Sequence, residues 1–494
     1  MAWPVSRLDR RVYGPAVSLT VLLLVVSARY GFHRDELYFI ESAKHPAWGY
    51  IDNPSLTPMI GWLSRRLFGD SLFGLRVIPA LEAGLIVVCV SMVARELGGE
   101  RRAQLLTAVI TATAGFIDAI GHLLTTPTFD VLISTVLLVV LVRIARTGDH
   151  RWWLAAGAAI GVALENKYTI VLLVLSLAAG VIATRAWSRL WSPWLLAAVG
   201  IAVVLALPQL LWQIHHDWPQ LSFARALARN EGGENRGTLI PFQFVIIGPP
   251  LAPLLVAGWW SLARRPVWTP IRFIAVGYLV LLALLLVTGG KGYYAAGLFG
   301  VLIPSAAIAL VDWIDRSTGS ARRLILAAGI VVNAVVGAIV TLPILSASAV
   351  DSPIGALNED AKETIGWPTF VDQVAAVAAT VPADERANLV IFTSNYGEAG
   401  AIDRYGASRG LGPAYSGHNS YADFRVPSGS DGPVLVVGYA GLGTDSSWFT
   451  DCRQAATVHT IDDIDNQVNG NAIWLCTAPQ RPWASLWPDL RHEG

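Results

Sequence analysis

Eleven long apolar runs constrain what this chain can fold into more than any other feature. They lie near residues 12–32, 72–97, 103–124, 127–146, 152–164, 168–184, 190–212, 241–263, 271–289, 293–314 and 324–345. A helix needs about 20 mostly apolar residues to cross a bilayer. Hydrophobic residues make up 54% of the 494 residues and charged residues 15%, whereas roughly a quarter of a soluble domain is charged. The sequence therefore predicts a polytopic α-helical membrane protein with one helix for each run.

The charge balance and the hydropathy exclude two other classes of protein. The 36 basic and 36 acidic side chains cancel, so the sequence predicts no basic surface for nucleic acid. Intrinsic disorder requires low hydrophobicity, and the mean hydropathy of this chain is +0.50. The lipid bilayer is the environment that the composition fits.

The last third of the chain has a different character. From about residue 346 onward Pro, Gly, Asp, Asn and Ser become frequent, and no spanning run remains. Two apolar stretches bounded by turn residues, Leu389–Thr393 and Val434–Tyr439, predict buried strands. We therefore expect a transmembrane module over residues 1–345, with its first outer loop at 33–71, and a soluble α/β domain over residues 346–494.

The distribution of arginine predicts the orientation, because cytoplasmic loops carry an excess of positive residues. With a cytoplasmic N-terminus, the inner side collects Arg7, Arg10, Arg11, Arg101, Arg102, Arg146, Arg151, Arg185, Arg189, Arg264, Arg265, Arg272, Arg316, Arg322 and Arg323. An odd number of helices then places the C-terminal domain outside the inner or plasma membrane. In an oxidising outer compartment Cys452 and Cys476 could form a disulfide. No cleavable signal is evident, so we expect the first helix to be retained.

The predicted outer loops collect acidic, basic and aromatic residues. The first loop carries His33–Tyr38 directly after the first helix and then Trp48–Leu56, and we expect it to form helices along the interface. The later outer turns carry His122, Thr125–Asp130, Glu165–Tyr168, Trp212–Pro219 and Gly289–Tyr294. Two of the four lysines, Lys167 and Lys291, therefore lie on the side where positive charge is less common.

Each of these residues also has a purely structural interpretation. Acidic residues such as Asp35 and Glu36 are common after a helix, and Lys167 could extend its ammonium to the lipid headgroups. Tyr293 and Tyr294 could be interfacial belt residues. Asp130 is harder to explain in this way, because it lies one turn inside a helix, where a carboxylate needs a cavity or a partner. No zinc spacing, Walker A sequence, Rossmann glycine pattern or nucleophile elbow is present.

Group transfer from a lipid phosphate is the chemistry that fits acids and lysines on one membrane face. The phosphate leaving group needs cationic partners such as Lys167 and Lys291. The acceptor hydroxyl needs a carboxylate within hydrogen-bond reach to take its proton. The membrane presents the donor, so no soluble nucleotide-binding domain is needed.

A family resemblance rests on the order of several short motifs. They are Asp35-Glu36, Trp48–Leu56 with Asp52 and Pro54, Asn166-Lys167-Tyr168, Leu211–Pro219, Gly289–Tyr294 and, in the tail, Ser394–Gly397 and Tyr415–Ser420. Over about residues 30–310 the chain resembles bacterial membrane glycosyltransferases of the dolichyl-phosphate-mannose–protein mannosyltransferase type. These enzymes have the GT-C superfold and are related to the lipid A aminoarabinose transferases.

The resemblance implies a polyprenyl-phosphate sugar donor, a cell-envelope acceptor and an inverting displacement on the extracytoplasmic face. Catalysis then falls on Asp35 as general base with Glu36 beside it. Binding of the donor phosphate falls on Lys167, Lys291, Arg34 and Tyr293. Binding of the sugar or the acceptor falls on Asp130, Asp52, Asn53, His216 and Tyr294.

The chain departs from the family pattern at two positions. Some relatives carry a lysine or histidine directly before the proline at Pro54, where this chain has Asn53, so one phosphate contact is in doubt. Relatives often have an acidic residue at the outer end of the fourth helix, where this chain has Thr126-Pro127. Asp130, one turn further on, could supply that carboxylate.

Two other functions remain as alternatives. A transporter or flippase for a lipid or polar solute would also need intramembrane polar groups, but transporters commonly show internal repeats, and we see none here. A non-catalytic scaffold that binds a wall polymer would leave Lys167, Lys291 and Asp130 without a purpose. The sequence names neither the sugar nor the acceptor. It predicts no definite cofactor, and a divalent cation held by Asp35 and Glu36 is possible.

Overall fold

The computed structural model describes residues 3–351, 358–429, 431–442 and 446–494, and its contacts divide the chain into two units. The helical unit comprises Met1–Ser27, Asn53–Thr57 and Phe73–Leu342, and the mixed unit comprises Ala28–Asp52, Pro58–Leu72 and Pro343–Gly494. Most of the loop that the sequence assigns to the transmembrane module thus groups with the C-terminal residues.

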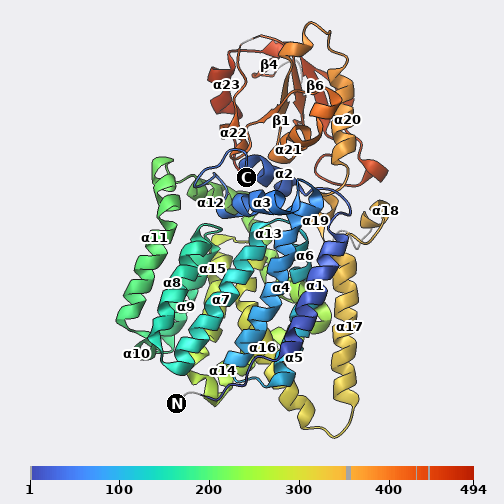
Figure 1. Cartoon of the computed structure of the whole chain (residues 1–494). Helices are drawn as coiled ribbons and strands as arrows, with labels where there is room; N and C mark the ends of the chain where they lie inside the picture. Colours follow the sequence, from blue (N-terminus) through green and yellow to red (C-terminus); the bar gives the residue numbers. More distant parts are fainter. Residues whose placement is uncertain (1–2, 352–357, 430, 443–445) are drawn as a thin grey trace. The chain divides into compact units, whose positions relative to one another are not determined.

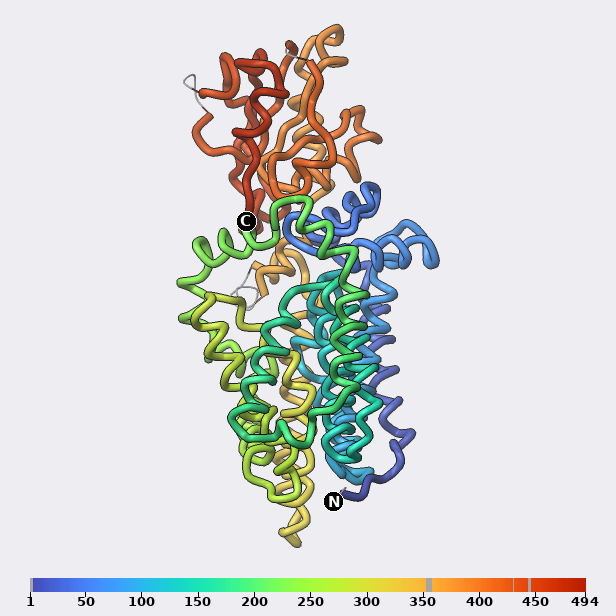
Figure 2. The backbone as a smooth tube through the Cα atoms, turned by 90° about the vertical axis from the view of Figure 1, so that its left-hand side faces the viewer, coloured from blue at the N-terminus to red at the C-terminus, as the bar shows by residue number. Residues whose placement is uncertain are grey.

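The helical unit is a bundle whose long helices run side by side (Figures 1 and 2). Its helices are α1 Tyr13–Val26, α4 Leu72–Glu96, α5 Arg101–Ala112, α6 Gly115–His122, α7 Thr126–Thr147, α8 Trp153–Leu164, α9 Thr169–Ala183, α10 Trp187–Leu190, α11 Pro193–His215, α12 Pro219–Asn230, α13 Gly232–Ile247, α14 Pro253–Arg264, α15 Arg272–Thr288, α16 Phe299–Asp315 and α17 Ala321–Thr341. A 3₁₀ segment, η5, covers Gly292–Leu298.

Six helical segments in the described part of the chain are long and apolar enough to cross a membrane, and the number rises to eight if each of two bent pairs is one span. The predicted run 241–263 is not one straight helix, because α13 and α14 meet at a bend of 90°. The bend lies at Gly248-Pro249-Pro250, where Gly248 has φ 97° and the prolines lack the N–H that would continue the helix. The predicted count of eleven spans therefore remains a prediction.

Small residues allow the closest helix contacts in the bundle. A Cβ atom on Gly157 of α8 would lie 2.3 Å from the Ala198 carbonyl oxygen of α11, and one on Gly161 would lie 2.7 Å from the Leu205 Cβ. Helix packing inside a membrane depends on such close approach, because lipid supplies no hydrophobic drive between helices. The spacing of four residues between the two glycines places both on the same face of α8.

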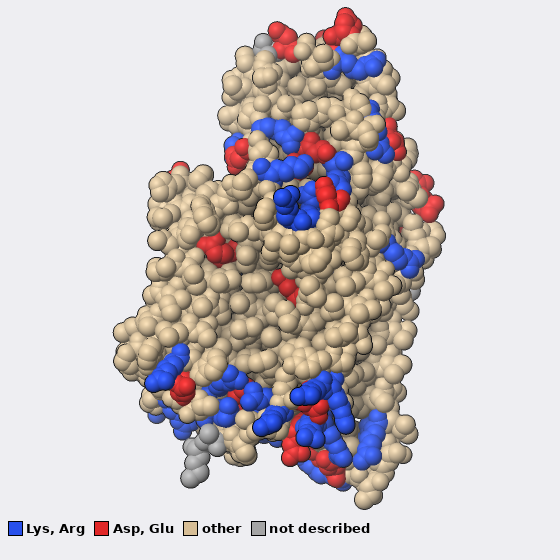
Figure 3. Space-filling view, viewed as in Figure 1, with Lys and Arg blue, Asp and Glu red and all other residues tan. Residues whose placement is uncertain are grey.

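The outer surface of the bundle has the character of a lipid-facing surface. Along α17 most side chains point outward, and Leu324, Ile325 and Val331 are each at least 60% exposed. Lys and Arg side chains gather at the end of the bundle that carries the N-terminus, and few charged side chains interrupt the band beyond it (Figures 1 and 3). An apolar band next to a cationic end is the pattern expected of helices inserted in a bilayer.

The mixed unit is an α/β structure. Its helices are α2 Arg34–Ser42, α3 Leu56–Phe68, α18 Ala347–Val350, α19 Glu359–Lys362, α20 Trp367–Ala378, α21 Tyr396–Tyr405, α22 Tyr421–Phe424 and α23 Trp483–Leu490, with the first two residues of α3 belonging to the helical unit. Its strands are β1 Val390–Thr393, β2 Ala414–Ser416, β3 Val434–Val437, β4 Phe449–Thr450, β5 Arg453–Thr457, β6 Ala472–Cys476 and β7 Ala478–Pro479. Both strands predicted from the sequence are confirmed as β1 and β3, and the first loop forms helices, as expected.

The main sheet has the strand order β2-β1-β3-β6-β5. β1 pairs in parallel with β2 and β3, whereas β6 runs antiparallel to its neighbours β3 and β5. β3 is buried at every residue, as expected of a central strand covered on both faces. Because β1, β2 and β3 are parallel, their carboxyl ends lie at the same edge of the sheet.

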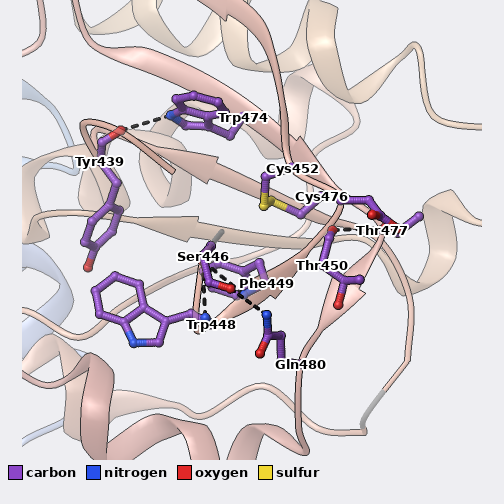
Figure 4. The surroundings of a disulfide bond; sticks show 11 residues. Tyr439, Ser446, Trp448, Phe449, Thr450, Cys452, Trp474, Cys476, Thr477 and Gln480 are labelled. Atoms are coloured by element: carbon purple, nitrogen blue, oxygen red, sulfur yellow. Dashed lines mark hydrogen bonds between the residues drawn. A yellow bond between two sulfur atoms is a disulfide. The ribbon is translucent and has the colours of Figure 1, made fainter. Parts of the chain in front are cut away.

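A disulfide joins Cys452 to Cys476 (Figure 4). It links the segment before β5 to the end of β6, 24 residues apart. Both cysteines belong to an apolar core that includes Phe392, Trp483 and Trp487. The third cysteine, Cys89, is free.

Candidate active site

The helix α2 begins with a capping box that fixes the direction of its acidic side chains. The His33 side chain accepts a hydrogen bond from the Asp35 N–H at 3.2 Å, and Glu36 accepts one from the His33 N–H at 2.9 Å. Glu36 is fully buried. Its carboxylate therefore helps to cap the helix, whereas the Asp35 side chain is one third exposed.

Asp35 receives a hydrogen bond from the C-terminal part of the chain. The Tyr396 hydroxyl donates to Asp35 Oδ1 at 2.8 Å. The Arg34 Nε lies 3.8 Å from the same oxygen, and His33 Nδ1 lies 4.0 Å from Oδ2. One hydroxyl donor and one guanidinium thus lie beside this partly exposed carboxylate, whereas His33 Nδ1 is already the acceptor of the Asp35 N–H.

Tyr396 is held in place by the turn between β1 and α21. Asn395 and Glu398 form a capping box at the start of α21, with Glu398 accepting hydrogen bonds from Ser394 and Asn395. Burial raises the pKa of Glu398 to about 7 despite these bonds. The centre of the Tyr396 ring lies 4.6 Å from the centre of the Tyr38 ring and 4.7 Å from the centre of the His418 ring. The hydroxyl therefore has little freedom to turn away from Asp35.

A second tyrosine–aspartate pair lies in the same unit. The Tyr38 hydroxyl donates to Asp52 Oδ1 at 2.6 Å. Burial raises the pKa of Asp52 to about 7, although the Tyr38 hydrogen bond acts in the opposite direction. Asp52 can therefore carry a proton near neutral pH.

Arg34, predicted to bind the donor phosphate, is engaged within the mixed unit. Its Nη1 donates to Gln467 Oε1 at 2.8 Å, and its guanidinium lies 5.9 Å from the centre of the Tyr396 ring. These contacts connect Arg34 to the same tyrosine that contacts Asp35.

In the helical unit, Lys167 lies in a shell of hydroxyls and aromatic rings between α8 and α9. Its Nζ donates to Thr126 Oγ1 at 3.2 Å and to the Tyr293 hydroxyl at 3.3 Å. It also lies 5.1 Å from the centre of the Tyr293 ring and 4.7 Å from that of Tyr294. The structure thus brings together three of the predicted residues, Lys167, Tyr293 and Tyr294.

Lys167 differs from the other three lysines in its ion pairing. Lys44 pairs with Glu41 at 2.5 Å, Lys291 with Glu231 at 3.0 Å and Lys362 with Asp351 at 2.9 Å. Within the described residues, Lys167 has no carboxylate oxygen within 4.0 Å of its ammonium. Its positive charge is balanced only by neutral oxygens and ring faces at contact distance, an arrangement that can accept an anion.

Asp130 is an acidic residue that acts electrostatically on Lys167. It lies in the first turns of α7, is 9% exposed, and accepts a hydrogen bond from Thr169 Oγ1 at 2.8 Å. The partner that the sequence requires for this intramembrane carboxylate is therefore present.

The segment Ser55–Thr57 is tied to the turn that carries Lys167. Ser55 donates to Glu165 Oε2 at 3.1 Å, and Thr57 donates to Asn166 Oδ1 at 2.7 Å. Asn53, just before it, donates to the Pro54 carbonyl at 2.8 Å and leaves its buried Oδ1 without a hydrogen-bond partner in the described part of the chain.

Lys291 and His216 lie at the ends of other helices of the helical unit, Lys291 shortly after α15 and His216 directly after α11. The carboxylate of Glu231 neutralises Lys291, although the backbone of Lys291 leads directly into η5 and its two tyrosines. His216 follows α11, stacks on Trp212 at 4.2 Å and contacts the Trp212 carbonyl through Nδ1 at 2.8 Å. Neither side chain contacts Lys167 within hydrogen-bond distance.

Two observations concern metal ions and cavities. Among the residues that the structure describes, no group of three or more His, Cys, Asp or Glu side chains is placed to hold a metal ion. A cavity of about 700 Å³ in the mixed unit lies by the amino ends of β1 and β2, lined by Arg386, Arg409 and Tyr415 among others. None of the predicted site residues lines it.

Sequence reasoning missed the partners of the predicted residues. Tyr396 lies in a tail motif that carries the resemblance, and Tyr38 lies in the first-loop motif, but nothing in their spacing joined them to Asp35 and Asp52. Thr126 and Thr169 are uncharged residues beside charged ones, so the pattern gave no signal for them. Tertiary contacts alone reveal these pairs.

Comparisons with known proteins agree with this architecture. The sequence model of the dolichyl-phosphate-mannose-protein mannosyltransferase family matches residues 52–212. Two undecaprenyl phosphate-alpha-4-amino-4-deoxy-L-arabinose arabinosyl transferases of Pseudomonas fluorescens are 28% and 24% identical over 310 and 302 residues. These alignments cover 58% and 56% of this chain and 54% and 51% of the relatives, so the chain spans about half the length of the curated relatives it matches.

A solved structure extends the likeness over nearly the whole chain. ArnT from Cupriavidus metallidurans bound to undecaprenyl phosphate superposes with a TM-score of 0.59 at 15% identity, covering 93% of this chain and 97% of ArnT. Its apo state gives a TM-score of 0.55. At this identity the likeness establishes the fold. The resemblance drawn from the motifs is confirmed: the chain is similar in sequence to the dolichyl-phosphate-mannose-protein mannosyltransferase family over residues 52–212 and to the undecaprenyl-phosphate aminoarabinose transferases, and it shares the fold of ArnT.

Proposed function

We propose that this protein is a glycosyltransferase that moves a sugar from a polyprenyl-phosphate donor to a cell-envelope acceptor on the extracytoplasmic face. The observation that carries the proposal is the state of Lys167, a lysine with no ion pair among the described residues, held by hydroxyls and rings. The names of the relatives support the donor class, because they are undecaprenyl-phosphate aminoarabinose transferases.

Lys167 has the properties that a departing phosphate requires. An ammonium that donates to neutral hydroxyls can exchange one of them for a phosphate oxygen, and the new hydrogen bond is charge-assisted and therefore stronger. The hydroxyls of Thr126 and Tyr293 are further donors for the same anion. Lys291 would join them by leaving Glu231, which makes its contribution smaller than that of Lys167.

Asp35 is assigned the role of general base. It would accept the proton of the acceptor hydroxyl while the acceptor oxygen forms its bond to the anomeric carbon and the bond to the phosphate oxygen breaks. A single displacement of this kind inverts the anomeric carbon. Glu36 is the weaker candidate, because its buried carboxylate caps α2. Asp52, Asn53, Asp130, His216 and Tyr294 remain assigned to the sugar or the acceptor.

Two features support the proposed orientation. The cationic end of the bundle carries the N-terminus (Figures 1 and 3), and the positive-inside rule places this end in the cytoplasm. The disulfide between Cys452 and Cys476 suits an oxidising compartment. Attachment of a membrane-impermeant thiol reagent to a cysteine introduced at exposed Thr318, between α16 and α17, tests this orientation. Labelling from inside only is expected, and labelling from outside would contradict it.

The function is tested with the full-length protein in lipid nanodiscs. A panel of polyprenyl-phosphate sugars is offered with cell-envelope extract as acceptor, and wild type is compared with Asp35→Asn and Lys167→Ala. Transfer by wild type that is lost in Asp35→Asn supports the assignment. Movement of the intact donor across the bilayer with no sugar transfer would favour the flippase alternative and refute the proposal.

A further inference from the structure

We infer that Tyr396, from the C-terminal α/β region, is a positioning residue that orients Asp35 for proton abstraction through a hydrogen bond to Oδ1. Asp35 is a base only if the proposed function holds, so the inference depends on it. The C-terminal region would then take a direct part in the reaction, because one of its side chains holds the base.

The geometry places one hydroxyl against one carboxylate oxygen. Tyr396 donates to Asp35 Oδ1 at 2.8 Å, within the ordinary range for a short, charge-assisted O–H···O bond. The other carboxylate oxygen, Oδ2, lies 4.0 Å from His33 Nδ1. A hydrogen bond to Oδ1 fixes the rotation of the carboxylate about its Cβ–Cγ bond, and so fixes the direction in which Oδ2 receives a proton.

The fold supplies reasons for the tyrosine to stay protonated and in place. Burial and the nearby Asp35 raise the pKa of Tyr396, so its hydroxyl donates rather than ionises at any working pH. The residue begins α21 directly after the carboxyl end of β1, between two residues of a capping box. Its ring is packed between Tyr38 and His418. Ligand-contacting residues commonly occupy the carboxyl ends of parallel strands.

The contact also joins two distant parts of the chain. Asp35 and Tyr396 are 361 residues apart in sequence. The same connection is reinforced by close packing, because a Cβ on Gly397 would lie 2.8 Å from the Arg34 Cβ and one on Gly400 would lie 2.9 Å from the Leu37 Cβ. Glycines on one face of α21 thus let α2 approach closely enough for the hydroxyl to reach the carboxylate.

Several other charged or titratable groups act on this carboxylate. On its own helix and cap these are Arg34 and His33, and His33 in turn faces Asp360, while Arg34 faces Glu363. From other segments of the mixed unit, Asp52 and His418 act electrostatically on Asp35. Burial lowers the pKa of His418 to about 3, so it is neutral near pH 7, whereas Asp52 titrates in that range.

The test removes a single hydroxyl and leaves the packing ring in place. Tyr396→Phe is assayed for sugar transfer in nanodiscs across pH 5 to 9, beside wild type and Asp35→Asn. The matched control is Tyr421→Phe, because Tyr421 is also buried and also donates to an aspartate, Asp403, which is paired with Arg425 instead. Thermal unfolding of all variants is followed in parallel.

A positioning role predicts a fall in kcat of about 10-fold with little change in the KM for the donor, since a hydrogen bond to a charged group is lost. The hydrogen bond stabilises the carboxylate, so its loss should move the acid limb of the pH–rate profile upward by about one unit. The profile is repeated in an Asp52→Asn background, because the pKa of Asp52 is raised to about 7 and its own titration falls inside the pH range measured. Tyr421→Phe should lower the melting temperature without moving the profile.

Each remaining outcome identifies what has failed. If Asp35→Asn is inactive but Tyr396→Phe keeps the wild-type kcat and pH profile, the inference is wrong and the proposed function stands. A loss of kcat in Tyr396→Phe with an unmoved profile and a lowered melting temperature would mean that the hydroxyl is merely structural. Turnover by Asp35→Asn, or no turnover by wild type, would overturn the proposed base or function and the inference with it.

Discussion

Replacing Lys167 by methionine should weaken binding of the polyprenyl-phosphate donor more than any other single loss of a lysine. Methionine keeps the length and apolar character of the side chain, so its stem can still pack beside Tyr293 and Tyr294. What disappears is the ammonium that donates to Thr126 and Tyr293 and that would donate to the phosphate.

The expected magnitude follows from the contacts. In the unliganded protein Lys167 makes two hydrogen bonds to neutral oxygens, at 3.2 and 3.3 Å, so its removal should cost only about 1 kcal/mol of stability. With donor bound, the lost contact is a hydrogen bond between charged groups, worth about 1.5–3 kcal/mol. At 1.36 kcal/mol per factor of ten, the dissociation constant of the donor should rise roughly 10- to 150-fold.

The assay is titration of undecaprenyl phosphate into nanodiscs, followed by native mass spectrometry, with undecaprenol as the ligand that lacks the phosphate. Lys362→Met is the matched control, since Lys362 pairs with Asp351 and is no site candidate. Lys167→Met should lose affinity for undecaprenyl phosphate but not for undecaprenol, and Lys167→Arg should retain part of the affinity for undecaprenyl phosphate. Equal binding of undecaprenyl phosphate by wild type and Lys167→Met would refute the assignment of Lys167 to the phosphate.

Three further predictions concern stability. Because the pKa of Asp52 is raised from 3.8 to about 7 in the folded protein, ionisation of Asp52 destabilises the fold by at most about 4 kcal/mol, a loss that builds up between about pH 4 and pH 7. Asp52→Asn should therefore gain more melting temperature over wild type at pH 8 than at pH 5, and equal gains at both would contradict this. Replacing Cys452 and Cys476 together by serine should cost about 3 kcal/mol, as expected for opening a loop of 24 residues, seen as a lower unfolding midpoint of the C-terminal region in nanodiscs; an unchanged midpoint would contradict it. Gly157→Val should destabilise the bundle by more than 2 kcal/mol, because its Cβ would overlap the α11 backbone, while Gly200→Val, which faces open space, should be neutral in the same thermal assay.

The sequence predicts the helical part well because a membrane helix can be recognised without a helical repeat of apolar and polar residues. A membrane helix satisfies its backbone internally, so a long apolar run is enough to indicate it, and every predicted run contains a helix. The bend at Gly248 was not predicted. The run 241–263 was identified by its apolar character alone, and Gly248, Pro249 and Pro250 do not interrupt that character although they break the helix. The strands β1 and β3 were found because both are short, apolar and bounded by turns.

The candidate site was predicted only in part, for a physical reason. Charged residues such as Asp35, Asp130 and Lys167 are conspicuous in an apolar chain, because burying a charge is costly and demands an explanation. Their partners are neutral hydroxyls, such as those of Tyr396 and Thr169. A neutral hydroxyl costs little free energy in most environments, so its position in the sequence does not indicate a site. The partners come from distant segments, and only the fold brings them together.

The central claim, transfer of a sugar away from a polyprenyl phosphate, is tested most directly by stoichiometry. Purified wild-type protein in nanodiscs receives the donor identified from the panel together with its acceptor, and both products are counted over a single turnover. One polyprenyl phosphate should appear for each sugar joined to the acceptor, and Asp35→Asn should form neither product. Release of no polyprenyl phosphate while donor is consumed or moved intact would contradict the claim.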